Sequence, residues 1–159
     1  MVLLNESNLG LEHIVNNEYR QWNIRNAKSF KDAQVITLKF YKNLPLKDSE
    51  NEFNKFIKKL NKLVYKNAYI RYGKQLNYVC VSEGDRSTKR HIHLTIDKPN
   101  WLWSLKFKSH VQHLWTYVER NGEVHFGYGE DEETAYSKYQ LKNKTKDLVN
   151  YSFNEHILL

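Results

Sequence analysis

Two histidines lie one residue apart in the stretch KRHIHLTID, residues 89–97. Side chains of a strand alternate between two faces, so His91 and His93 project from the same face, roughly 6–7 Å apart, while the aliphatic residues between and after them point to the core. Glu83 ends the preceding apolar run, and the short loop GDRST can return the chain beside it as a β-hairpin. Two imidazoles and one carboxylate suit a divalent ion, Mn²⁺ or Mg²⁺, and also Zn²⁺ or Fe²⁺. The alternative is that both histidines are ordinary half-exposed strand residues.

A second pair of residues with catalytic potential lies nearer the C-terminus. Tyr139 and Lys142 are three residues apart, so they share a face if their segment is helical. Residues 131–144, DEETAYSKYQLKNK, begin with acids and continue with lysines, an order that suits a helix dipole and predicts a helix. Beside a metal-polarised phosphate, the tyrosine hydroxyl can attack phosphorus while the lysine neutralises the developing charge. The alternative is a packed tyrosine and a solvated lysine, because such pairs are frequent.

Alternating and helical patterns predict the elements that would position these residues. Strands are expected over residues 33–40, 76–83, 90–96 and 123–129. A first helix is expected to begin at the capping box Ser49-Glu50-Asn51-Glu52 and to bury apolar residues from Phe53 to Val64. A second helix is expected to end at Asn121-Gly122 and to bury five apolar residues: Phe107, Val111, Leu114, Trp115 and Val118.

The order of these elements predicts the fold class. It reads β-α-β-β-α-β, followed by the helix that carries Tyr139. We therefore expect an α+β protein with a ferredoxin-like (split βαβ) antiparallel sheet, helices on one face and an additional nucleophile-bearing helix. Residues 1–159 are expected to form a single domain, in which residues 1–32 carry no clear structural pattern.

Composition points to a soluble protein with an anionic partner. Lys and Arg exceed Asp and Glu by 7, which favours a nucleic acid, although a basic soluble protein without such a partner is the alternative. The single cysteine, Cys80, excludes an internal disulfide and is expected in the core. The chain shows no signal peptide, no apolar stretch of membrane-spanning length and no phosphate-binding loop. We expect an intracellular protein of the cytoplasm that is neither secreted nor membrane-bound.

Basic and aromatic residues around the histidines are candidates for DNA contacts. Four cations are placed for phosphates in the predicted hairpin and first strand: Lys39, Arg86, Lys89 and Arg90. Trp101 and Trp103 could stack on bases, but indoles beside a helix start are more often core residues. The lysines of the first helix are interpreted as a solvated face rather than a DNA site.

Three ordered blocks resemble the HUH endonucleases, the superfamily of rolling-circle replication initiators, conjugative relaxases and single-strand transposases. VITLKF resembles the first strand motif, RHIHLTI the His-hydrophobic-His motif, and YQLK the Tyr-x-x-Lys motif on a helix. The blocks run from residue 35 to residue 142 in the family's order. The chain looks most like a small single-tyrosine initiator (Rep) of a virus, phage or plasmid, or a nuclease domain of a longer chain.

The resemblance implies a ferredoxin-like fold and a role for each motif residue. His91, His93 and Glu83 would hold a divalent metal, Mn²⁺ or Mg²⁺. Tyr139 would attack a phosphate of single-stranded origin DNA and stay linked to the 5′ end, with Lys142 as its helper. The freed 3′-OH would prime synthesis, with a host polymerase or helicase as a further partner. Two departures are that Lys39 stands where a small or hydroxylic residue is common, and that a second tyrosine, Tyr136, precedes the motif.

Tyr136 and several rival functions offer alternatives to this interpretation. Tyr136 has no lysine three or four residues later, so Tyr139 is the expected nucleophile. A cupin-type metalloenzyme would share Gly84 and Asp97 around the histidines, but three helical patterns argue against an all-β fold. The alternatives that stay open are a non-catalytic nucleic-acid-binding module of the same fold and an HUH nuclease of the relaxase or transposase type. The sequence does not indicate an oligomeric state.

Overall fold

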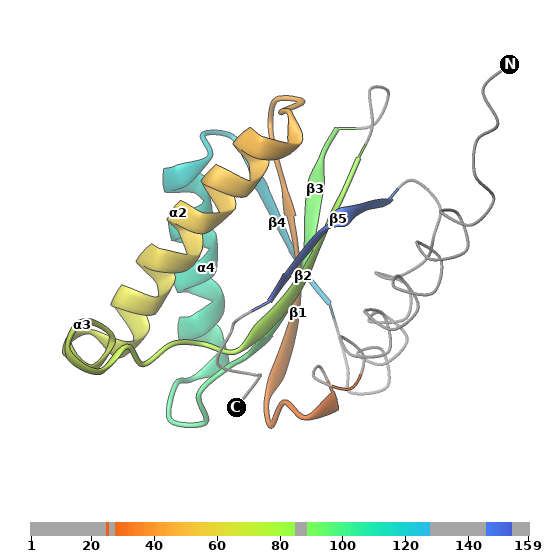
Figure 1. Cartoon of the computed structure of the whole chain (residues 1–159). Coiled ribbons are helices and arrows are strands. Elements are labelled where there is room, and N and C mark those ends of the chain that lie inside the picture. The colour runs from red at the N-terminus through yellow and green to blue at the C-terminus, as the bar shows by residue number, and fades with distance from the viewer. Residues whose placement is uncertain (1–24, 26–27, 85–88, 128–145, 154–159) are drawn as a thin grey trace, which may run out of the picture.

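The chain folds as an antiparallel sheet with two long helices packed on one of its faces (Figure 1). The computed structural model describes residue 25 and residues 28–84, 89–127 and 146–153, the last range by backbone only. Within them, the strands β1 (Ala33–Lys39), β2 (Tyr78–Glu83), β3 (His91–Asp97), β4 (Glu123–Phe126) and β5 (Lys146–Phe153) form one sheet. The strand order is β4-β1-β3-β2-β5.

Helices α2 (Leu46–Tyr65) and α4 (Ser104–Val118) cover the same face of the sheet, and the short α3 (Asn67–Tyr72) follows α2. This α+β arrangement is consistent with the ferredoxin-like split βαβ order, so the predicted fold class is confirmed. None of the helices in the described residues combines the length and apolar character that a membrane span requires.

Alternation along β3 separates the core from the candidate site, as the sequence predicts. Three aliphatic side chains of β3 are at most 3% exposed and belong to the hydrophobic core under the helices: Ile92, Leu94 and Ile96. The buried face of α4 adds Phe107, Val111 and Trp115, and Cys80 is buried in the same cluster. His91 and His93 alternate with the aliphatic residues and therefore project from the other face of the sheet.

The first helix begins one turn earlier than predicted. It starts at Leu46, and the backbone N–H of Ser49 already donates to the carbonyl of Pro45 at 3.0 Å. The side chain of Ser49 is buried and donates to the carbonyl of Leu46 at 2.7 Å, so it does not cap a helix end. The predicted capping box is therefore wrong. The physical reason is that Pro45, with φ of −56°, can stand immediately before a helix start.

Two elements have no counterpart in the sequence-based prediction. Helix α3 interrupts the connection from α2 to β2, and β5 adds a strand beside β2. The predicted fourth strand is shorter than expected, since β4 ends at Phe126, and α4 ends at Val118, a few residues before Asn121. The helix predicted over residues 131–144 lies outside the described residues.

Candidate metal centre

The end of β2 and the start of β3 bring the three predicted metal ligands together. The two strands pair antiparallel with Glu83 directly opposite His91, so the hairpin places the carboxylate beside the histidine strand. Gly84, which follows Glu83, has φ of +146°, a conformation that residues with a side chain rarely adopt. A Cβ on Gly84 would lie 2.6 Å from the Cα of Arg90. Glycine at this position therefore lets the end of β2 and the start of β3 approach each other closely beside the Glu83 carboxylate.

The ligand atoms converge on one point. The Nε2 atoms of His93 and His91 lie 3.0 Å and 3.6 Å from the same oxygen, Oε2 of Glu83. The two imidazole rings are 4.8 Å apart between centroids and nearly perpendicular. The side chains are largely shielded from water, with exposed fractions of 20% for His91, 15% for Glu83 and 7% for His93. Low exposure strengthens the electrostatic interactions between these groups.

A backbone carbonyl fixes the orientation of His91. Its Nδ1 lies 3.1 Å from the carbonyl oxygen of Lys89. A carbonyl only accepts hydrogen bonds, so Nδ1 must carry the hydrogen, and in the neutral ring the lone pair is on Nε2. That lone pair faces Glu83, which is the arrangement that a metal-binding histidine requires.

A hydroxyl on the central strand contacts the other histidine. Thr37 lies opposite His93 in the β1–β3 pairing, and its Oγ1 is 3.3 Å from Nδ1 of His93. The contact leaves Nε2 pointed at Glu83. Sequence reasoning gave Thr37 no role. The missing information was the register between β1 and β3, which alternation within one strand does not define.

The donor set fits a divalent cation. Among the described residues, Glu83, His91 and His93 are the only group of three or more candidate ligands, and their ligand atoms lie within 4.8 Å of one another. Neighbouring ligands of an octahedral ion lie about 3 Å apart, since each sits about 2.1 Å from the ion. The observed 3.0 Å and 3.6 Å separations are close to this spacing. A two-histidine, one-carboxylate set leaves other positions of an ion open for substrate.

Residues 33–147 match the sequence model of a family described as replication-associated protein ORF2. This range is more than half of the chain. The chain belongs to the replication-associated protein ORF2 family. The comparison with curated proteins and the comparison with solved structures gave no match. Membership of the ORF2 family gives the chain a role in replication and implies interaction with nucleic acid.

The ORF2 match includes the predicted nucleophile, although the structure does not describe it. Tyr139, Lys142 and Tyr136 all lie in the undescribed range 128–145, and so their position relative to the metal centre stays a prediction. Their assignment comes from the sequence motif alone. Of the predicted site residues with a chemical role, the structure therefore describes the three candidate metal ligands.

The four cations predicted to contact DNA differ in their surroundings. Lys39 lies directly opposite His91, with its side chain 49% exposed and its Nζ 3.8 Å from a carboxylate oxygen of Glu123. Lys89 is exposed beside the histidine strand. Arg90 is only 8% exposed, and its guanidinium donates to the hydroxyl of Ser82.

The burial of Arg90 does not suit the predicted DNA contact. Arg90 shares the alternation of the core residues of β3 rather than that of His91, which is the physical reason for its position. Arg86 lies outside the described residues. Of the four predicted contacts, the structure therefore leaves Lys39 and Lys89 exposed, at the end of the sheet where the three candidate metal ligands lie.

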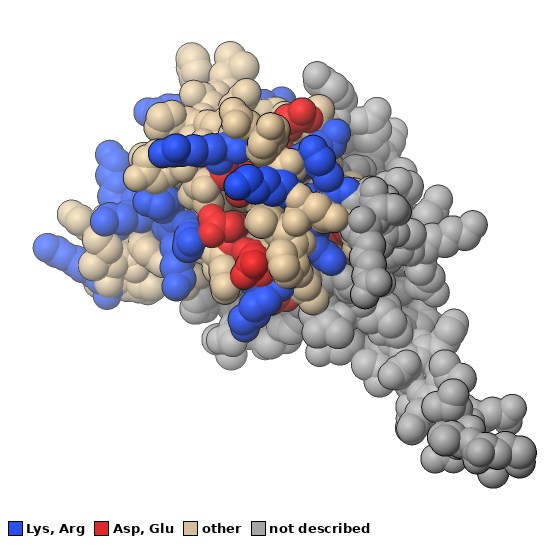
Figure 2. Space-filling model, turned by 90° about the horizontal axis from the view of Figure 1, so that it is seen from above, with Lys and Arg blue, Asp and Glu red and all other residues tan. Residues whose placement is uncertain are grey.

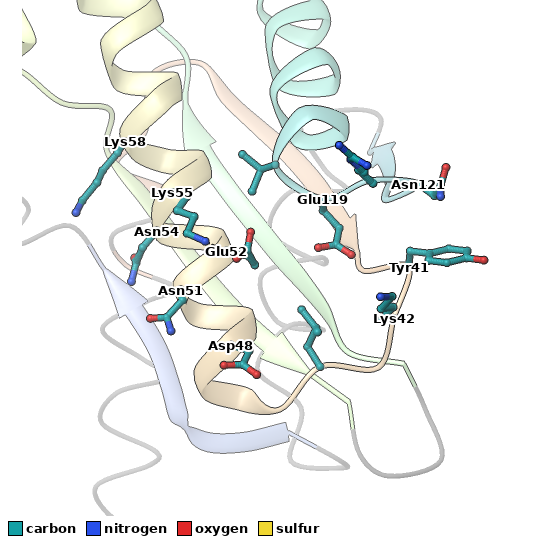
Figure 3. A pocket seen from close by; sticks show the side chains of 13 residues that line it. Tyr41, Lys42, Asp48, Asn51, Glu52, Asn54, Lys55, Lys58, Glu119 and Asn121 are labelled. Carbon is teal, nitrogen blue, oxygen red and sulfur yellow. Dashed lines mark hydrogen bonds and ion pairs between the residues drawn. The ribbon is translucent and has the colours of Figure 1, made fainter.

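An open pocket of about 1010 Å³ lies at the same end of the sheet, on the helical side (Figure 3). Figure 3 shows Asp48, Asn51 and Glu52 approaching it from α2, and Tyr41 from the loop after β1. The ring of Tyr41 is 5.4 Å from Nζ of Lys89, so the pocket and the metal-site hairpin adjoin. Acids and lysines both line this pocket. It brings no metal-ligand group together among the described residues.

Proposed function

We propose that the chain is a metal-dependent, site-specific single-stranded DNA endonuclease of the HUH type that initiates rolling-circle replication. The observation that carries the proposal is the convergence of Glu83, His91 and His93 on one point in a chain of the ORF2 family. In a replication-associated chain, a divalent cation held by these three ligands would supply the polarisation that cleavage of a nucleic-acid phosphodiester needs.

The chain's own residues would divide the chemistry between them. The Tyr139 hydroxyl oxygen would form a bond to phosphorus, and the bond from phosphorus to the 3′ oxygen would break. The tyrosine would lose its hydroxyl proton, and the leaving 3′ oxygen would take up a proton, so the products would be a 5′-phosphotyrosine and a free 3′-OH. Lys142 would stabilise the negative charge that develops on the phosphate oxygens. A divalent cation, Mn²⁺ or Mg²⁺, held by the three ligands would polarise the phosphate.

Two exposed lysines would hold the strand beside this centre. Lys39 lies next to His91 across the β1–β3 pair, and Lys89 lies two residues before His91 in the chain. Both lie at the same end of the sheet as the ligands, so they can neutralise phosphates on either side of the cleaved bond. Because the phosphotyrosine replaces one phosphodiester bond by another, the reaction can run in reverse, and the enzyme would also rejoin strands.

A nicking assay with matched tyrosine variants tests the proposal. The full chain is incubated with end-labelled single-stranded DNA pools in Mn²⁺, and cleavage is read on a denaturing gel. Tyr139→Phe should abolish cleavage and leave DNA binding nearly unchanged, while Tyr136→Phe, the matched control, should cleave normally. His91→Ala, His93→Ala and addition of EDTA should each stop cleavage.

Other outcomes would contradict parts of the proposal. Full cleavage in EDTA would exclude the metal role. Cleavage lost in Tyr136→Phe and kept in Tyr139→Phe would show that Tyr136 is the nucleophile. Binding without cleavage by the unsubstituted chain on every pool would instead favour a non-catalytic nucleic-acid-binding module.

A further inference from the structure

Acidic residues are absent from most of the helical layer. Residues 53–82 contain seven Lys or Arg and no Asp or Glu, and residues 98–118 likewise contain no Asp or Glu. These two ranges include most of α2 and all of α3 and α4. In Figure 2, Lys and Arg line the outer edge of the helical side, and both basic and acidic residues lie across the middle of that view. The helical layer is therefore uniformly basic away from the start of α2.

Six of these cations are available for a ligand. They are exposed, and they form no ion pair with any residue that the structure describes: Lys58, Lys59, Lys62, Lys66, Arg71 and Lys74. Lys55, by contrast, is paired with Glu52 at 2.7 Å. Unpaired cations close together repel one another, and a polyanion relieves that repulsion.

A stripe of lysines runs along one side of α2 toward α4. Residues 55, 59 and 62 recur at spacings of four and three, so they share one face of the helix, and Lys66 follows directly as the C-cap residue of α2. The Nζ of Lys59 lies 4.9 Å from the ring centre of Tyr117, which α4 presents with 68% exposure. The stretch from residue 55 to residue 66 is about 17 Å long at 1.5 Å per residue.

Exposed aromatic rings continue this surface at the far end of the helices. Trp101 and Trp103 are 62% and 80% exposed, contrary to the expectation that they are core residues. The ring of Tyr65 lies 6.3 Å from Trp101 and 5.2 Å from the Nζ of Lys74, so aromatic and cationic groups adjoin.

The loop that carries the two tryptophans is anchored from within. Lys98 is 4% exposed, and its Nζ donates to the carbonyl of Leu102 at 2.8 Å and pairs with Asp32. Leu102 itself is buried in the core. The neighbouring indoles are therefore held outward by a fixed loop, where they offer flat faces for stacking.

We propose that this helical basic surface, formed by Lys58, Lys59, Lys62, Lys66, Arg71, Lys74, Trp101, Trp103 and Tyr117, is a second binding surface for single-stranded DNA. Lysines neutralise phosphates and exposed aromatic rings stack on unpaired bases, whose faces a duplex does not offer. The surface lies on the opposite side of the sheet from His91 and His93, so it binds a stretch of strand separate from the one at the metal centre. The proposal does not depend on cleavage.

Binding in EDTA tests the surface without any contribution from metal-dependent cleavage. Fluorescence anisotropy of a labelled 20-nucleotide oligo-dT measures the affinity of the full chain in 0.1 M NaCl. The variant Lys59→Gln/Lys62→Gln/Lys66→Gln should bind at least about tenfold more weakly, because each lost phosphate contact is worth about fivefold at this salt concentration. The control Lys28→Gln/Lys31→Gln/Lys47→Gln removes the same charge from exposed positions elsewhere and should bind normally. Equal losses in both variants would overturn the proposal.

Photocrosslinking identifies the residues that contact the DNA, and a duplex probe tests whether the surface prefers a single strand. In the unsubstituted chain, an oligonucleotide with 5-iodouracil should photocrosslink to Trp101, Trp103 or Tyr117, and crosslinks confined to other residues would contradict the proposal. Trp101→Ala/Trp103→Ala should weaken oligo-dT binding about tenfold and leave duplex binding unchanged. Tighter binding of a duplex than of oligo-dT, with no loss of binding in the tryptophan variant, would show that the surface binds duplex DNA rather than a single strand. Failure of nicking would leave all of these outcomes unaffected.

Discussion

The hydrogen bond between Thr37 and His93 gives a sharp test of how the metal centre is held. Oγ1 of Thr37 lies 3.3 Å from Nδ1 of His93, whose other nitrogen points at Glu83. When Nε2 binds a cation, Nδ1 carries the hydrogen and donates it to the hydroxyl. Thr37→Val keeps the shape of the side chain and removes this acceptor. We expect weaker metal binding with little change in fold.

The energy and length of this hydrogen bond determine how much metal affinity the substitution should remove. A neutral hydrogen bond contributes about 1 kcal/mol, which corresponds to about fivefold in an equilibrium constant. Loss of a group that orients a metal ligand typically weakens binding by about tenfold or more. At 3.3 Å the bond is longer than most. We therefore expect Thr37→Val to weaken Mn²⁺ binding by about five- to tenfold.

Isothermal titration calorimetry of the full chain with Mn²⁺ measures this effect without a DNA substrate. Thr37→Ser retains the hydroxyl and should retain most of the affinity. Thr95→Val is the matched control, because Thr95 lies on the same face of β3, is fully buried, and its Oγ1 has no hydrogen-bond partner among the described residues. The nitrogen chemical shifts of His93 should report a changed tautomer balance only in Thr37→Val.

Two results would contradict an orienting role for the Thr37 hydroxyl. An equal loss of affinity in Thr95→Val would show that Thr37→Val acts through general destabilisation of the sheet. Unchanged affinity in Thr37→Val, with unchanged imidazole shifts, would exclude an orienting role for the hydroxyl.

Three further predictions concern the residues around the metal centre and the pocket. Glu83→Gln should weaken Mn²⁺ binding by at least about tenfold in calorimetry, because it removes the only charged ligand of the group, and affinity equal to the unsubstituted chain would exclude Glu83 from the site. Gly84→Ala should lower the melting temperature and Mn²⁺ affinity together, because its Cβ would meet the backbone of Arg90; an unchanged melting curve would contradict this. Burial, reinforced by the charge of Glu52 and opposed by a backbone hydrogen bond, raises the pKa of Glu119, so its ionisation opposes folding as the pH rises through that pKa. Glu119→Gln should therefore melt at a higher temperature than the unsubstituted chain at pH 7, and this difference should be smaller at pH 4. An equal difference in melting temperature at the two pH values would contradict the raised pKa of Glu119.

Local patterns were sufficient to predict the face on which the histidines lie. Alternation assigned His91 and His93 to the side opposite the core, and the short hairpin loop placed Glu83 within reach. Both inferences depend only on strand geometry and on contacts between neighbouring elements. The contact between Thr37 and His93 could not be predicted in this way, because it depends on the pairing of β1 with β3. That pairing joins residues more than fifty positions apart.

The predictions that the structure corrects share a dependence on tertiary contacts. Ser49 has the sequence signature of a helix cap, yet the helix has already started at Leu46 and the serine is buried. Arg90 was grouped with the DNA contacts by charge, although its alternation places it with the core residues. Trp101 was expected in the core by its hydrophobicity, whereas Lys98 fixes the loop that holds it outward. Residue type favoured one environment, and the packing of the loop or strand selected another.

The most direct test of the central claim is the chemical identity of the product. The full chain is incubated with labelled single-stranded DNA in Mn²⁺, denatured and digested, and the DNA-linked peptide is sequenced by mass spectrometry. We expect a phosphodiester bond between Tyr139 and the 5′ end of the cleaved strand, formed in Mn²⁺ and absent in EDTA and in His91→Ala. Cleaved DNA without any protein adduct, or an adduct that forms equally in EDTA, would contradict it.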